Sequence, residues 1–259
     1  MQDSTTMEAS ARPDIAILDR SDLAHALSTG WSDFRRAPGI GLLFASVYVL
    51  GGWFLTFISG GFAAQTIILA LGFPLVGPFA AVGLYETSRR IEEGEPLDLR
   101  QILGVVWREK DRQIPWAGAI IVIYFLFYSF LAHMIFALFM GLSVMTNISS
   151  SLEVFLTPNG LAMIAVELIV GAILGFVLFA LTVFSLPLMV DKEIDFMTAM
   201  LLSFQAVREN LGVMTLWALF IAVSVVLAMI PLYLGLLVVL PVLGHATWHL
   251  YRRALIAPE

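Results

Sequence analysis

Six long runs of apolar residues constrain this chain more than any other feature. They lie near residues 39–58, 62–85, 116–140, 161–186, 211–228 and 232–251. Each run has about the 17–25 residues that a helix needs to cross the hydrocarbon core of a bilayer. Lipid offers the backbone no hydrogen-bond partners, so such segments fold as helices. The pattern predicts an all-α polytopic membrane protein whose six transmembrane helices form three hairpins.

The basic residues support this topology. All 14 Lys and Arg residues fall in the amino-terminal segment, in 86–115, in 187–210 and in the carboxyl-terminal segment. Cytoplasmic loops are enriched in Lys and Arg, so both termini are predicted to be cytoplasmic. The alternative merges the last two runs into one long helix broken at Pro231. That helix would place Arg252 and Arg253 on the opposite side, and the charge distribution therefore favours six spans.

The remaining composition excludes several classes of function. Hydrophobic residues make up 59% of the chain and charged residues 13%, whereas soluble domains are about 25% charged. The chain has no cysteine, which excludes disulfides and thiolate metal sites. The basic residues are scattered, so no nucleic-acid partner is predicted. We find no phosphate-binding, dinucleotide or hydrolase motif, and no cofactor or metal is expected.

The amino-terminal part precedes the first span. Residues 1–20 are polar and are predicted to form a disordered cytoplasmic tail. Residues 21–38 are predicted to form an interfacial amphipathic helix, capped at Ser21-Asp22 and anchored by Trp31 at headgroup depth. Its apolar stripe consists of Leu23, Ala26, Leu27, Trp31 and Phe34. Residues 39–255 then form the six-helix transmembrane domain.

Two prolines, Pro74 and Pro78, interrupt the second run. Each removes an amide donor from a helix, which leaves the carbonyls of Ala70 and Pro74 without intrahelical partners. We therefore expect a broken helix packed against protein rather than lipid. A weak threefold repeat is also visible, since similar short segments begin near residues 30, 105 and 203. Each would be an interfacial helix that precedes a hairpin.

Two ionisable residues, His133 and Glu167, lie inside predicted spans, where such groups mark functional sites by default. Small residues share their helical faces at four-residue spacing, and these include the pair Gly171 and Gly175. We expect both ionisable side chains to face inward and toward each other. Two interpretations stay open: a hydrogen-bonded pair that locks two helices, or a site for a proton or a substrate.

A second candidate group lies at the cytoplasmic end of the last span. His245 and His249 are four residues apart, and two such histidines can share a metal or flank a haem. Glu86 lies at a similar depth on the second span and would complete a cluster. The alternative is that these histidines are interfacial anchors beside Trp248. Residues 91–112 either dock on headgroups or a partner, or form a solvated connector.

Residues 72–90, with Gly72-Phe-Pro-Leu-Val-Gly-Pro78 and Gly83-Leu-Tyr-Glu-Thr-Ser-Arg-Arg90, and residues 243–252 carry a family resemblance. The chain resembles a family of bacterial integral membrane proteins known as a domain of unknown function, over about residues 20–255. Some members are labelled cytochrome c oxidase subunit I-like. This chain has only four histidines, fewer than a haem-copper subunit needs. The resemblance implies a helical fold in the bacterial cytoplasmic (inner) membrane.

Taken together, the residues predict a membrane protein without an enzymatic centre. Its expected partners are the lipid bilayer and a larger membrane complex, in which it has an accessory, assembly or scaffolding role. A respiratory complex is the first guess. The alternative is a small-solute or proton-coupled transporter or channel that uses the broken second helix and the pair formed by His133 and Glu167.

Overall fold

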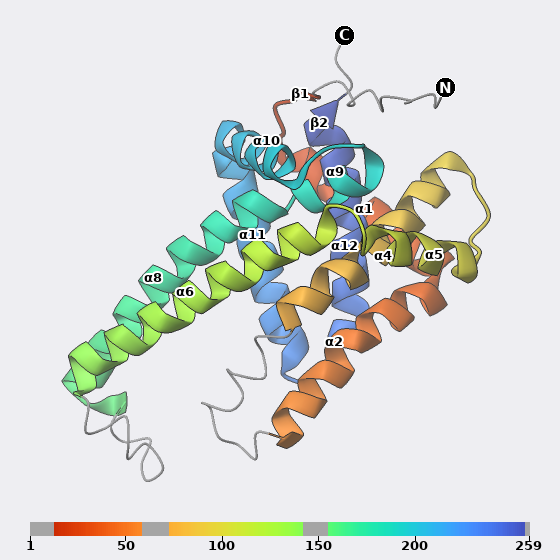
Figure 1. Cartoon of the computed structure of the whole chain (residues 1–259). Helices are drawn as coiled ribbons and strands as arrows, with labels where there is room; N and C mark the ends of the chain where they lie inside the picture. Colours follow the sequence, from red (N-terminus) through yellow and green to blue (C-terminus); the bar gives the residue numbers. More distant parts are fainter. Residues whose placement is uncertain (1–12, 59–72, 142–154, 257–259) are drawn as a thin grey trace, which may run out of the picture.

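The computed structural model describes residues 13–58, 73–141 and 155–256, and these ranges are almost entirely helical (Figure 1). The helices are α1 (Arg20–Arg36), α2 (Pro38–Ile58), α4 (Phe73–Glu93), α5 (Leu99–Glu109), α6 (Ile114–Met140), α8 (Pro158–Thr182), α9 (Ser185–Asp191), α10 (Phe196–Glu209), α11 (Leu211–Met229) and α12 (Leu236–Ala254). The predicted all-α class is confirmed.

Three parts of the described chain are long and apolar enough to cross a membrane. They are α6, α8 continued by α9, and α11. A fourth at most is the pair of α1 and α2, which meet at a bend of 102°. The described residues thus contain three candidate membrane spans, or up to four. The described part of α4 and the whole of α12 are less apolar, because both carry charged side chains toward their carboxyl ends.

The last helix, α12, is the centre of the packing. It contacts α1, α2, α4, α9 and α11, and Figure 1 shows it in the middle of these helices. Trp248 and Leu250 are fully buried, and Tyr251 is 2% exposed. Burial of such large side chains removes the most apolar surface per residue. α12 therefore forms the core against which the other helices are placed.

The first helix packs on α12 through a close backbone approach. Asp19 caps α1 and forms a reciprocal capping box with Asp22, so the cap lies two residues before the predicted one. A Cβ atom on Gly30 would lie 2.5 Å from the backbone nitrogen of Ala246. The buried face of α1 therefore includes Gly30, whereas Trp31 is 45% exposed. Leu23, Ala26 and Phe34 of the predicted stripe are buried on the same face, and only a residue without a side chain at position 30 admits the α12 backbone.

The two ends of the described chain pair with each other. Strand β1 (Asp14–Ile15) pairs antiparallel with β2 (Leu255–Ile256). Asn210, between α10 and α11, accepts a hydrogen bond from the amide of Leu18 at 2.6 Å. Residues 1–12 of the predicted disordered tail lie outside the described ranges. For residues 13–19 the prediction is wrong, because these contacts order the chain from the strand onward.

The last two apolar runs form two helices. Between α11 and α12, Leu232 and Tyr233 adopt positive φ angles of 52° and 66°. A Cβ on Gly235 would lie 2.7 Å from the Cα of Ala228, so the chain turns back closely on itself. Trp53 donates a hydrogen bond to the Leu232 carbonyl at 2.8 Å, which attaches α2 to this turn. The alternative of one long helix broken at Pro231 is therefore wrong.

The helices α6 and α8, which we call the arm, extend away from the rest of the molecule (Figure 1). They pack on each other, and the Tyr124 hydroxyl donates a hydrogen bond to the Leu174 carbonyl at 2.7 Å. Most of the arm's apolar surface stays exposed. The exposed side chains include Ile123, Phe127, Phe130 and Leu138 on α6 and Leu168, Ile169 and Ile173 on α8.

The order of elements matches the predicted repeat in one respect. The shorter helices α1, α5 and α10 each precede a longer helix, namely α2, α6 and α11. Asp98 and Asp195 cap α5 and α10 by accepting hydrogen bonds from amides of the first turn. Hydrogen bonds of this kind hold the Asp195 carboxyl at a pKa below its usual value, as expected for a cap.

Candidate functional sites

A buried polar cluster joins three helices next to the core. His245 and His249 lie on one face of α12, with Asp33 on α1 and Ser88 on α4 opposite them. The Ser88 hydroxyl donates to Asp33 Oδ2 at 2.9 Å and lies 2.7 Å from His245 Nδ1. His249 Nε2 lies 2.6 Å from the same Asp33 oxygen. One carboxylate therefore receives hydrogen bonds from two other helices.

The hydrogen bonds determine the tautomer of His245. The single hydroxyl proton of Ser88 goes to Asp33, so Ser88 accepts from the protonated Nδ1 of His245. Nε2 of His245 is then an acceptor, and it is buried without a hydrogen-bond partner among the residues that the structure describes. Ser88 and His245 are fully buried, and Asp33 is 2% exposed. This closed arrangement fixes helix positions, and a substrate cannot reach it without movement of the helices.

Glu86 does not complete a cluster with these histidines, in contrast to the sequence-based prediction. Its carboxylate binds Arg89 through two nitrogens at 2.8 and 2.9 Å and Arg90 at 2.6 Å. Both arginines lie within about one helical turn of Glu86 on α4, so they bind its carboxylate in place of the histidines. Burial alone would raise the pKa of Glu86, but the hydrogen bonds and charges of the two arginines outweigh it and lower that pKa.

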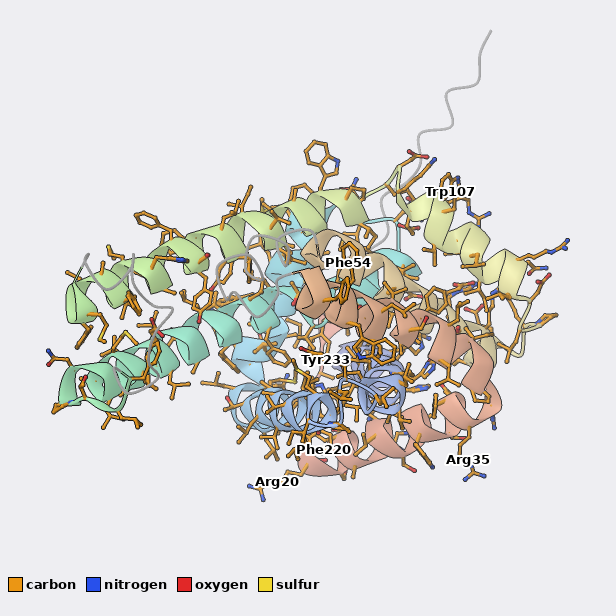
Figure 2. The ribbon with its side chains drawn as sticks, turned by 90° about the horizontal axis from the view of Figure 1, so that it is seen from below. Arg20, Arg35, Phe54, Trp107, Phe220 and Tyr233 are labelled. Carbon is orange, nitrogen blue, oxygen red and sulfur yellow. The ribbon has the colours of Figure 1, made fainter. Side chains whose placement is uncertain are left out.

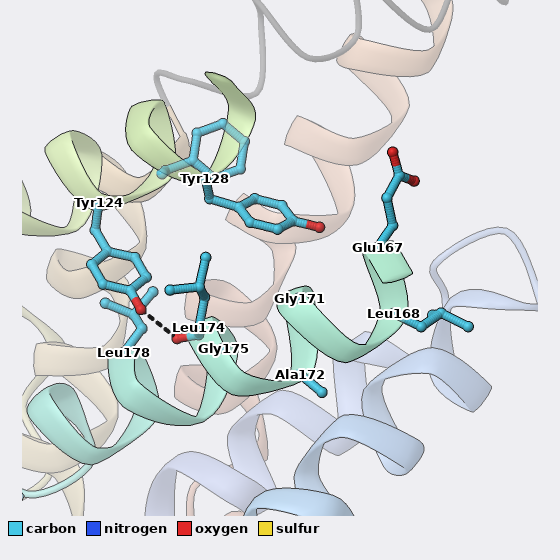
Figure 3. Close-up of a pocket in the computed structure, with 10 residues that line it drawn as sticks. Tyr124, Tyr128, Glu167, Leu168, Gly171, Ala172, Leu174, Gly175 and Leu178 are labelled. Atoms are coloured by element: carbon cyan, nitrogen blue, oxygen red, sulfur yellow. Dashed lines mark hydrogen bonds between the residues drawn. The ribbon is translucent and has the colours of Figure 1, made fainter. Parts of the chain in front are cut away.

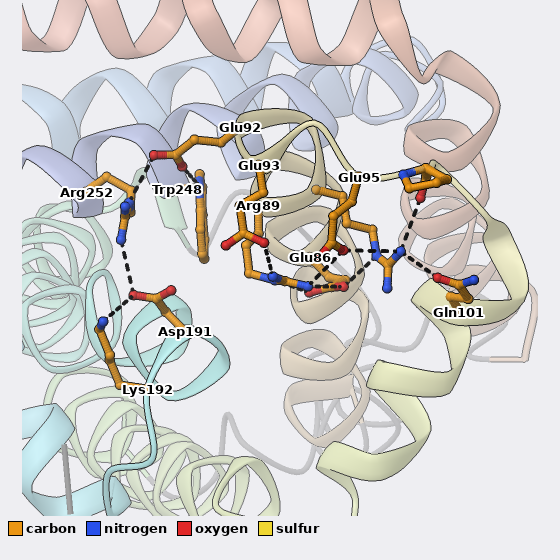
Figure 4. A network of polar contacts seen from close by, with 12 residues as sticks. Glu86, Arg89, Glu92, Glu93, Glu95, Gln101, Asp191, Lys192, Trp248 and Arg252 are labelled. Atoms are coloured by element: carbon orange, nitrogen blue, oxygen red, sulfur yellow. Dashed lines mark hydrogen bonds and ion pairs between the residues drawn. The ribbon is translucent and has the colours of Figure 1, made fainter.

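A wider network continues from Glu86 across the same end of the molecule (Figure 4). Arg90 also binds the Gln101 side chain at 2.8 Å, which attaches the start of α5. Glu92 accepts hydrogen bonds from Trp248 at 3.0 Å and from Arg252 at 3.2 Å. Asp191 accepts from Arg252 and Tyr251. We call this network and the Asp33 cluster the polar layer, and it ties α1, α4, α5, α9 and α12 together.

The described side chains include no group of three or more His, Cys, Asp or Glu residues placed to hold a metal ion. His245 and His249 each face a hydroxyl or a carboxylate of the polar layer. The geometry therefore assigns these histidines to helix–helix contacts.

The His133 side chain on α6 does not turn inward as the sequence predicted. The His133 ring binds the Ser129 carbonyl of its own helix at 2.7 Å, and the side chain is exposed. The ring is therefore exposed rather than turned inward, although His133 still interacts electrostatically with Glu167 on α8. The hydrogen bond to the preceding turn satisfies one ring nitrogen within α6.

Glu167 does face a recess, as its spacing from Gly171 and Gly175 predicted. It lines a groove of about 450 Å³ between α6 and α8, together with Tyr124 and Tyr128 (Figure 3). The Tyr128 hydroxyl would lie 3.2 Å from a Cβ on Gly171, whereas a Cβ on Gly175 would meet nothing within 4 Å. The groove thus combines one carboxylate with two tyrosine side chains, and its surface is open at Gly175.

The prolines fall at the start of α4, which runs unbroken through Pro74 and Pro78. Pro74 lies in the first turn, where a missing amide costs nothing. The expected break therefore does not occur within Phe73–Glu93. Ala70 and the rest of the predicted second span up to residue 72 lie outside the described ranges, as do the side chains of both prolines.

Residues 66–191 match the model of a family described as predicted integral membrane protein (DUF2189). This part of the chain is similar to that family, in agreement with the resemblance. The matched segment contains Pro74, Pro78, Glu86, His133 and Glu167, whereas His245 and His249 follow it. The match is narrower than the resemblance implied. No curated protein and no solved structure matches the chain significantly.

Sequence reasoning missed Asp33, Ser88 and the groove tyrosines as site residues. The available signal for Asp33 was its position ten residues after Leu23 and three after Gly30, on one helical face. That face is apolar at Leu23 and Ala26, so a carboxylate on it had to find a buried partner. Tyr124 and Tyr128 are four residues apart on α6, a spacing that places both rings on one side.

Proposed function

We propose that the chain is an accessory, assembly or scaffolding component of a larger membrane complex, with no enzymatic centre of its own. In this proposal α2, α4, α6, α8, α11 and α12 all cross the bacterial inner membrane as three hairpins. Both termini and the polar layer are cytoplasmic. The one-sided distribution of the 14 basic residues supports this orientation, and a respiratory complex is the first guess for the assembly.

The exposed arm is the observation that carries the proposal. Its two helices are long enough to span a bilayer, yet only 6% of the most apolar window of each is buried. Lipid can cover the apolar faces, but Glu167 on the groove wall is a carboxylate at a membrane-spanning position. Such a group is costly in lipid unless a donor pairs with it. A transmembrane helix of a partner fits the groove, because Gly171 and Gly175 permit close backbone approach.

The experiment blocks the groove with a larger side chain introduced on α8. Gly175→Leu places a branched side chain in open space, so we expect an unchanged melting temperature and a loss of the partner that co-purifies stoichiometrically in mild detergent. The matched control is Ile173→Phe, which enlarges an exposed residue outside the groove and should keep the partner. A wild-type protein that purifies alone, or a partner retained by Gly175→Leu, would contradict the accessory role.

The groove also favours a second candidate, a proton-coupled transporter, because Glu167 can exchange a proton whereas glutamine cannot. For the accessory role we expect equal proton flux in proteoliposomes that contain the wild type or Glu167→Gln. We also expect the partner to be retained, since glutamine still forms hydrogen bonds. Wild-type flux above that of empty vesicles, abolished in Glu167→Gln at an unchanged melting temperature, would replace the accessory role with transport.

A further inference from the structure

The outer face of α5 carries an apolar stripe that the rest of the described chain does not cover. Leu99, Leu103 and Trp107 recur every four residues and are 39%, 43% and 68% exposed. About a third of a turn away around the helix, Ile102 is fully buried and Glu109 is 2% exposed. α5 is therefore held by one side and presents the other outward, with Trp107 at the edge of the molecule (Figure 2).

Basic side chains line one flank of this stripe. With 3.6 residues per turn, Arg100 lies beside Trp107 around the helix, and Arg108 follows on the same side. Lys110 Nζ lies 3.9 Å from the centroid of the Trp107 ring and 3.9 Å from Asp111. The exposed half of α5 thus has an apolar strip next to the bundle and a cationic edge further out.

The arginines on α5 differ from five arginines elsewhere in the described chain. Arg89, Arg90, Arg112, Arg252 and Arg253 all pair with carboxylates. Within the described ranges, Arg100 and Arg108 form no salt bridge, although the charge of Arg108 acts on the neighbouring Glu109. The same holds there for Arg20, Arg35 and Arg36 on α1 and for Arg208 on α10, and Figure 2 shows Arg20 and Arg35 pointing outward. The unpaired arginines therefore gather on the three shorter helices, each of which precedes a longer apolar helix.

The position of α5 indicates what covers its outer face. α5 ends at Glu109, and α6, one of the apolar helices long enough to span a bilayer, begins at Ile114. Trp116 in the first turn of α6 is 62% exposed, so exposed tryptophans flank the junction. Tryptophan is enriched at the level of lipid headgroups. An amphipathic helix with a basic flank lies in that plane and attracts anionic lipids.

We propose that α5 lies in the headgroup layer and binds anionic phospholipids. Leu99, Leu103 and Trp107 enter the acyl boundary, while Arg100, Arg108 and Lys110 contact lipid phosphates. This inference rests on the proposed insertion of α6 in the bilayer. It adds a specific lipid class and the residues that recognise it.

The absence of cysteine allows a direct measurement on the full chain. Leu103→Cys, labelled with a nitroxide in nanodiscs that contain phosphatidylglycerol, is expected to be more accessible to oxygen than to a water-soluble nickel chelate. Ile123→Cys on the exposed face of α6 serves as the deep reference, and Lys192→Cys in the exposed segment after α9 as the aqueous reference. We expect position 103 to lie between them.

Three outcomes would overturn the inference in distinguishable ways. If position 103 matches the aqueous reference while position 123 reports lipid, α5 is not interfacial but the membrane insertion of α6 stands. If position 123 also reports water, the proposed placement in the bilayer fails as well. If position 103 is shielded from both reagents, a protein surface covers α5 instead of lipid.

Lipid selectivity tests the cationic edge. The double variant Arg100→Gln with Arg108→Gln should lower the ratio of bound phosphatidylglycerol to phosphatidylcholine, measured by native mass spectrometry, by about fivefold per residue removed. The charge-preserving variant Arg100→Lys with Arg108→Lys should retain the wild-type ratio. An unchanged ratio in the glutamine variant, with position 103 still at headgroup depth, would show that α5 binds lipid without charge selectivity.

Discussion

Replacement of Asp33 by alanine is expected to destabilise the protein by about 3 kcal/mol. The substitution leaves the Ser88 hydroxyl and the His249 ring nitrogen without their shared acceptor, and each buried donor without a partner costs about 1–3 kcal/mol. Unfolding in detergent, followed by circular dichroism against added dodecyl sulfate, measures the loss. Asp33→Asn keeps one acceptor oxygen and should lose about half as much.

The control for this prediction is Asp111→Ala. The Asp111 side chain is 78% exposed and lies 3.9 Å from Lys110, and surface pairs of this kind contribute about 0–1 kcal/mol. If Asp33→Ala unfolds at the same detergent concentration as Asp111→Ala, the buried cluster does not hold α1, α4 and α12 together.

The second large effect is expected at Gly30. In Gly30→Ala the new methyl group would lie 2.5 Å from the Ala246 nitrogen and 2.8 Å from the Val242 carbonyl oxygen. Both atoms belong to the α12 backbone, so the two helices must separate. Overpacking of this kind costs about 1–3 kcal/mol, and we expect the upper end because the Asp33 hydrogen bonds would stretch too. The unfolding measurement used for Asp33→Ala provides the test.

Gly104→Ala is the matched control for that substitution. Gly104 also lies inside a helix, but a Cβ there would meet nothing within 4 Å. Alanine should stabilise α5 by up to about 1 kcal/mol through helix propensity. Equal effects of the two substitutions would mean that the approach of α1 to α12 is not tight.

The helices were predictable because their signals are local. The run at 211–228 became α11 (Leu211–Met229), and the run at 116–140 became α6 (Ile114–Met140). Apolar composition and terminal caps specify such elements without reference to the rest of the chain. The same holds for the face of α8 that carries Glu167 and Gly171, since helical spacing alone aligns them.

The partners of the histidines were not predictable, because they are far away in the sequence. Ser88 lies 157 residues before His245, and Asp33 lies 216 before His249. No periodicity of a single helix links such positions. Glu86 failed as the predicted partner because arginines three and four residues away compete locally. The sequence does not indicate that α12 is central. It therefore does not indicate which face of each neighbouring helix turns toward α12.

The central position of α12 has a consequence for biosynthesis. Because α12 follows every helix it organises, α1, α2, α4 and α11 leave the ribosome before their common packing partner exists. During that interval Asp33 and Ser88 lack their histidine partners, and Gly30 lacks the α12 backbone against which it packs. The core around α12 can therefore close only after the chain has been translated through residue 254.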